Sequence, residues 1–98
     1  MKRAPASISD ASVICYTPID ARHRATGKTR HVVGGAVQAA VPGLAICQYP
    51  EDPGFYLFYC DAEWAPITDT WHASIEEAKH QAEFEYQGSA ATWIAAAK

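Results

Sequence analysis

A chain of 98 residues can bury one hydrophobic core, and its length excludes two domains with separate cores. Hydrophobic residues make up 49% of the chain and the net charge is only −3, which excludes a typical disordered composition. Because many hydrophobic positions are alanines, the aromatic residues, 11% of the chain, must supply much of the buried area.

Charge is divided unevenly along the chain. Residues 1–49 carry six basic and two acidic side chains, whereas residues 50–98 carry two basic and nine acidic ones. The second half of the chain should therefore present an acidic surface.

Nothing in the sequence indicates export or membrane insertion. The polar residues up to Asp10 leave no room for the apolar core of a signal peptide. The longest uncharged stretch, 32–50, is interrupted by glycines and prolines and predicts no membrane-spanning helix. Cys15, Cys47 and Cys60 are an odd number at wide spacings, which is not a disulfide framework. We therefore expect a soluble protein of the reducing cytoplasm.

The N-terminal part of the chain predicts a tail and two strands. Residues 1–11 have few apolar side chains and should form a disordered tail, which leaves 12–98 as a single domain. The run 12–17 is rich in β-branched and aromatic residues and predicts a strand that Pro18 ends. A second strand is predicted over 31–40, where two glycines weaken it.

Three further strands are predicted in the middle of the chain. Residues 44–49 and 55–60 are apolar runs, and the loop between them is dense in turn-forming residues. Because the apolar residues of 55–60 do not alternate with polar ones, both faces of this strand should be covered, as at the centre of a sheet. The last strand, 64–68, should lie at an edge because Pro66 has no backbone amide to donate.

A helix signal begins at Ser74. This serine and Glu77 have the spacing of a capping box, and Gly88 is placed to end the helix. We therefore predict a helix over 75–87. Its inward face should consist of Ile75, Ala78, Ala82 and Tyr86. The predicted fold class is α+β, an antiparallel meander of four or five strands packed against one C-terminal amphipathic helix.

Two apolar surfaces of this fold still need a cover. Phe84 lies on the side of the helix away from the inward face, where Trp93 and Ile94 of the C-terminal tail could cover it. One helix also covers only one face of the sheet. The C-terminal tail or a second subunit should cover the other face.

The stretch from Arg22 to His31 contains the only basic cluster and a partial phosphate-loop motif. The motif, GKT from Gly27, lacks the glycine five positions earlier, so a charged turn is the favoured interpretation. The basic cluster could neutralise phosphates or an acidic partner. A sequence pI near 5.7 and the absence of an RNA-binding signature argue against nucleic acid.

Metal and nucleophile chemistry are not favoured. The three cysteines and His72 lack the paired spacing that fixes two metal ligands locally, so we expect no metal and no cofactor. Cys60 with His72 and either Asp61 or Asp69 supplies the side chains of nucleophilic catalysis. However, Cys60 lies on a strand that we predict to be buried, where thiolate formation is disfavoured. A non-enzymatic role is therefore the favoured interpretation.

The segment 68–72 joins the last predicted strand to the helix and holds an acid, an aromatic ring and an imidazole. Asp69, Trp71 and His72 could line a ligand pocket there, because connecting loops often carry function. The competing interpretation is structural: Trp71 caps the core, Asp69 bonds turn amides and His72 is solvated.

Half of the chain, from about 44 to 93, resembles a group of small bacterial proteins. The similarity is carried by the runs AICQYP, FYLFYCD, DTWH, SIEEAKHQAEFEYQG and TW. It implies a shared strand, corner and helix, and it implies no activity. A looser likeness to the small sheet-and-helix domains of antitoxins and immunity proteins is one of architecture.

The sequence therefore favours a protein-binding module, either a homodimer or an immunity- or antitoxin-like partner. Large aromatic side chains are typical of interface centres. The predicted anchors are Trp64, Trp71, Phe84 and Trp93. We expect no nucleic-acid or membrane partner. The alternative is a small-molecule binder or small enzyme with its site at Asp69, Trp71 and His72.

Overall fold

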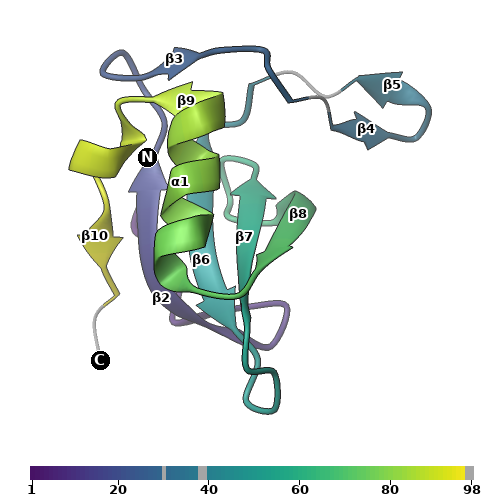
Figure 1. The fold of residues 1–98 in the computed structure, drawn as a ribbon, viewed down its shortest axis with the longest axis vertical. Helices are drawn as coiled ribbons and strands as arrows, with labels where there is room; N and C mark the ends of the chain where they lie inside the picture. Colours follow the sequence, from purple (N-terminus) through teal and green to yellow (C-terminus); the bar gives the residue numbers. More distant parts are fainter. Residues whose placement is uncertain (30, 38–39, 97–98) are drawn as a thin grey trace.

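An antiparallel sheet curled as a half-barrel forms the body of the protein, and one helix lies across one of its faces (Figure 1). The computed structural model describes residues 1–29, 31–37 and 40–96. The fold class predicted from the sequence, α+β with one C-terminal helix, is confirmed. No helix among the described residues is long and apolar enough to cross a membrane.

The main sheet has the strand order β1-β2-β6-β7-β8, and β10 also pairs with β2. Its strands are β1 (Ser7–Ile8), β2 (Ala11–Pro18), β6 (Gly43–Gln48), β7 (Phe55–Cys60), β8 (Pro66–His72) and β10 (Ile94–Ala95). Two short pairs lie outside it, β3 (Arg24–Ala25) with β9 (Tyr86–Gln87), and β4 (Val32–Val33) with β5 (Ala36–Val37). The helix α1 spans Ile75–Glu85, and a 3-10 turn, η1, spans Ser89–Ala91.

The predicted strands 12–17, 44–49 and 55–60 correspond to β2, β6 and β7. The strand predicted over 64–68 is shifted, because β8 begins at Pro66 and its pairing with β7 continues to His72. This strand lies at the end of the sheet order, as Pro66 predicts.

The strand predicted over 31–40 is wrong where the structure describes it. Residues 38 and 39 lie outside the described residues, and 32–37 form the separate hairpin of β4 and β5. Gly34 and Gly35 have φ values of 60° and 83°, the left-handed conformation of a tight hairpin turn. The chain therefore folds back on itself here, and β2 pairs directly with β6.

The N-terminus is more ordered than the tail expected for residues 1–11. Ser9 and Asp10 have positive φ values and turn the chain so that Ile8 pairs with Ala11. Ile8 is only 4% exposed. The buried Ile8, the turn after it and the bond from the amide of Val13 to the carbonyl of Ala6 attach this segment to the sheet.

The core on the helix side of the sheet confirms the predicted inward face of α1. Ala78 and Ala82 are fully buried, Tyr86 is buried and Ile75 is partly buried. They pack against a cluster from the sheet that includes Leu44, Ile46, Leu57 and Tyr59. Small alanines let the helix approach the large side chains of β6 and β7 closely.

The other face of the sheet is covered mainly by Trp64 and the N-terminal segment. Trp64 is 2% exposed, packs edge-on against Tyr16, and donates its indole N–H to the carbonyl of Lys2 at 2.9 Å. Ile8 joins the same cluster, and Ala96 from the C-terminal tail packs against it. Both faces of β7 are therefore buried, as predicted, but the chain's N-terminus supplies much of the cover.

Helix α1 begins at the predicted cap and ends before Gly88. The Ser74 hydroxyl accepts the amide of Glu77 at 3.1 Å, and the Glu77 carboxylate accepts the amide of Ala73 at 3.0 Å. The helix stops at Glu85 because the next two residues pair with β3 as strand β9. The predicted range of 75–87 is thus two residues too long.

Burial should protect the three cysteines from alkylation. Burial raises the pKa of Cys47 and of Cys60 to about 12, and it also raises the pKa of Cys15. Because the thiolate is the reactive form, native protein at mildly alkaline pH should resist iodoacetamide, whereas denatured protein should be alkylated at all three cysteines. Intact-mass spectrometry counts the adducts. Rapid alkylation of native protein would contradict this packing.

Candidate functional site

The segment of residues 24–29 crosses the C-terminal end of α1, and we call it the strap. Its first two residues pair with β9. The amide of Thr26 donates to the carbonyl of Glu85 at 2.9 Å, and its hydroxyl donates to the carbonyl of Phe84 at 2.7 Å. The last carbonyls of a helix lack partners within the helix. Thr26 satisfies two of them and fixes the strap in place.

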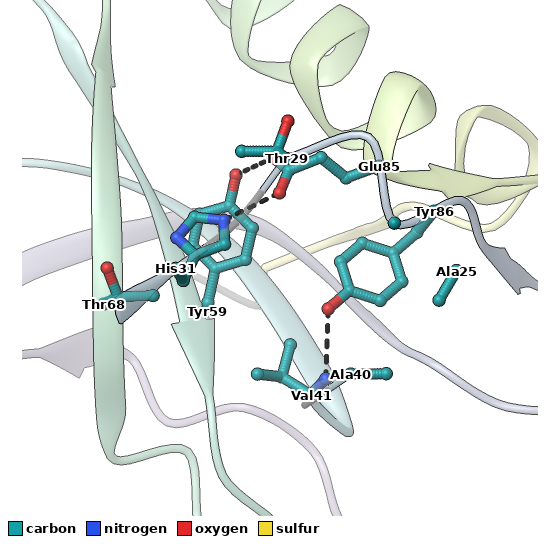
Figure 2. A pocket seen from close by; sticks show the side chains of 10 residues that line it. Ala25, Thr29, His31, Ala40, Val41, Tyr59, Thr68, Glu85 and Tyr86 are labelled. Carbon is teal, nitrogen blue, oxygen red and sulfur yellow. Dashed lines mark hydrogen bonds and ion pairs between the residues drawn. The ribbon is translucent and has the colours of Figure 1, made fainter. Parts of the chain in front are cut away.

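The two sides of the strap border two different hollows. Ala25, Gly27 and Thr29 line a small cavity between the strap, the sheet and the helix (Figure 2). The alternate residues, Arg24, Thr26 and Lys28, line a groove on the outside of the helix. Arg24 and Ala25 lie in strand β3, where successive side chains point to opposite sides, and the chain then turns at Gly27, which has a φ of 70°.

Glu85 is the central residue of the inner cavity. It is only 5% exposed, although it is a carboxylate. Its Oε1 lies 2.7 Å from Nε2 of His31, and its Oε2 accepts a hydrogen bond from the hydroxyl of Tyr59 (Figure 2). The same Oε2 accepts a second hydrogen bond, at 2.8 Å, from the side-chain amide of Gln81. A buried carboxylate is stable only with such partners.

His31 and Tyr59 also contact each other. Their ring centroids lie 4.2 Å apart. Burial, and next the hydrogen bond to Glu85, raise the pKa of the Tyr59 phenol well above its usual range. Tyr59 therefore keeps its proton and acts as a permanent donor to the carboxylate.

The inner cavity is too small for a substrate. Its volume is about 80 Å³, whereas ligand pockets usually enclose about 300–1,000 Å³. The hydroxyl of Tyr86, which lines it, accepts the amide of Val41 at 3.0 Å. Three donors already occupy the Glu85 carboxylate. This cluster is therefore suited to holding His31, two residues after the strap, and β7 against the end of the helix.

The outer groove has the size of a binding site. It encloses about 610 Å³ between the strap and the last turns of α1. The ring of Phe84 is 48% exposed, and the Lys28 ammonium lies 5.2 Å from the ring centroid. This is a cation–π contact. Lys28, not the C-terminal tail, is the residue placed over this ring.

The lining of the groove has a net positive charge because it holds two basic side chains, Arg24 and Lys28, and one carboxylate, Glu83. Glu83 accepts the amides of Gly88 at 3.0 Å and of Ala90 at 2.9 Å. These bonds lower the pKa of the Glu83 carboxyl. Arg24 and Lys28 take part in none of the ion pairs that connect the described residues.

The predicted pocket of Asp69, Trp71 and His72 does not assemble. All three lie within β8, where Asp69 and Trp71 project from the face opposite to that of His72. His72 bonds the hydroxyl of Thr70 at 2.7 Å, and burial lowers the pKa of its imidazole. The indole of Trp71 donates to Asp52 at 3.2 Å.

The four predicted anchors do not form one surface. Trp64 is a core residue, and Trp93 is partly buried against the helix-side core. Trp71 is 50% exposed on the sheet face away from the helix, whereas Phe84 is exposed on the helix. Of the four, only Phe84 lines a groove of ligand size.

The other predicted clusters are also separated. Cys15 packs in the helix-side core, and Cys47 and Cys60 pack on the opposite face. Cys60 and His72 therefore face different layers, which removes the nucleophile–base pair. Among the described residues, no group of three or more histidine, cysteine or carboxylate side chains is arranged to hold a metal ion.

Sequence reasoning missed Glu85 as a buried residue. A signal for it exists, because Glu85 lies three residues after Ala82 and seven after Ala78, on the same helix face. The basic cluster that holds Arg24 and Lys28 was recognisable, but its position beside Phe84 depends on long-range pairing.

Searches against protein-family models, curated proteins and solved structures returned no match for this chain. The strap and its two hollows are the features of the molecule that indicate a function.

Removing the Glu85 carboxylate should destabilise the fold. Glu85→Ala should lower the free energy of unfolding by about 3 kcal/mol, because the donors of His31, Tyr59 and Gln81 lose their shared acceptor in the interior. Glu76→Ala, at an exposed position of the same helix, should change it by less than about 0.5 kcal/mol. Urea unfolding measures both. Equal effects would show that the network contributes nothing.

Proposed function

We propose that this chain is a protein-binding module whose contact surface is the groove lined by Phe84 and the outer side of the strap. The observation that carries this proposal is a large aromatic ring, 48% exposed, in a groove of about 610 Å³. Exposed aromatic rings in concave surroundings are typical centres of protein interfaces.

The attachment of the strap supports the proposal. Thr26 bonds two carbonyls at the end of α1, and the pairing of β3 with β9 fixes the backbone next to it. A wall that is ordered before binding loses little conformational entropy when a partner docks. The groove is therefore suited to binding an extended segment of another protein.

The alternative of a small enzyme has less support. The residues of the predicted corner, Asp69, Trp71 and His72, are divided between two faces of β8. The remaining acid–base pair, His31 and Glu85, borders a cavity of only about 80 Å³. Neither arrangement offers room for a substrate beside a reactive group.

A library of random peptides displayed on phage tests the proposed groove. Selection against the native protein should enrich peptides whose binding falls by about tenfold or more in Phe84→Ala, as for a central aromatic residue of an interface. Trp71→Ala serves as the matched control, because Trp71 is equally exposed but lies on the other face of the sheet. Affinities of the synthetic peptides are measured by calorimetry.

Two outcomes would contradict the proposal. One is a selection that enriches no peptide above a protein-free control. The other is a set of peptides that bind Phe84→Ala as tightly as the wild type, which would place the contact surface elsewhere.

A further inference from the structure

The charges of the groove indicate what kind of segment it would accept. Among the residues that line it, Arg24 and Lys28 are basic and Glu83 is the only acid. The carboxylate of Glu83 accepts backbone amides of the turn after the helix. Two basic side chains against this one carboxylate leave the lining of the groove with a net positive charge.

Neighbouring basic residues do not add to this patch in the same way. Arg22, two residues before the strap, is paired with Asp20 through two hydrogen bonds of 3.0 Å to its carboxylate. Arg24 and Lys28 belong to no ion pair between described residues. Arg24 and Lys28, which no such ion pair engages, both line the groove beside Phe84.

The position of Lys28 joins the charge to the aromatic ring. Its ammonium lies 5.2 Å from the centroid of Phe84 and carries three donors. If a carboxylate of a peptide ligand binds this ammonium, the ligand's next side chain lies against the exposed ring of Phe84. The geometry therefore favours an acidic residue next to an apolar or aromatic one.

The rest of the protein strengthens the selectivity. The net charge is −3, and nine of the eleven acids lie in residues 50–98. A positive groove on an otherwise acidic protein attracts an acidic segment to one place and repels it elsewhere.

From this charge complementarity we infer that the groove's occupant is an acidic segment of a partner protein, with an apolar or aromatic side chain beside an aspartate or glutamate. The inference rests on the proposed function and specifies the partner's chemistry. A nucleic-acid strand is less favoured, because the two unpaired cations could neutralise few phosphates on a protein of negative net charge.

The peptides selected on phage test this inference separately from the proposed function. We expect the Phe84-dependent peptides to be enriched in aspartate and glutamate. For a synthetic representative, Lys28→Gln should weaken binding by about threefold to fivefold, the size of an exposed ion pair. Raising the salt concentration from about 50 mM to about 500 mM should also weaken the binding of this peptide to the wild-type protein.

Lys2→Gln is the matched control. Lys2 is an exposed lysine near the N-terminus, and its backbone contacts Trp64 on the sheet face away from the helix. Its substitution removes the same charge from the protein and should leave the affinity unchanged. An equal loss in both variants would mean that only net charge matters and would overturn the inference.

The remaining outcomes are also decisive. Phe84-dependent peptides that are neutral or basic would preserve the proposed function and overturn the acidic partner. If a single-stranded oligonucleotide displaces the acidic peptide and binds more tightly in a Lys28-dependent manner, the partner is a nucleic acid. That result would overturn the inference of an acidic protein segment. A selection without Phe84-dependent peptides would overturn both proposals.

Discussion

The buried carboxylate of Glu85 is the interaction on which the region around the helix end depends. A charge removed from water needs hydrogen bonds in exchange, and three segments of the chain supply them through His31, Tyr59 and Gln81. The main-chain carbonyl of Glu85 also accepts the amide of Thr26. One residue thus ties the strap to the helix and, through Tyr59, ties the helix end to the sheet.

The groove outside the helix follows from this attachment. The strap has no core of its own, so its bonds to the helix end and its pairing with β9 hold it in place. Its inner residues close a small cavity around Glu85, and its outer side chains, including Lys28, form a charged wall beside Phe84. The inner network is structural, and the surface that it supports is the one suited to binding.

Local signals predicted the elements whose partners are near in sequence or whose composition is extreme. The apolar run 55–60 and the cap at Ser74 are examples. The strap was beyond such signals, because Thr26 and Glu85 are 59 residues apart. The prediction of one strand over 31–40 is wrong, because β-propensity does not reveal that Gly34 and Gly35 turn the chain back. For the site, the sequence supplied Phe84 and the basic cluster separately, and only the fold places them together.

Amide hydrogen exchange at Thr26 tests the central role of Glu85 most directly. In the wild type this amide should be protected by at least about a hundredfold relative to an unstructured peptide, as for a bonded amide in ordered structure. Glu85→Ala keeps the carbonyl that accepts this amide but removes the carboxylate that holds His31, two residues after the strap. The protection of Thr26 should therefore fall, while the amide of Leu57 at the centre of the sheet stays protected. Fast exchange of Thr26 in the wild type, or protection that Glu85→Ala leaves unchanged, would contradict the account.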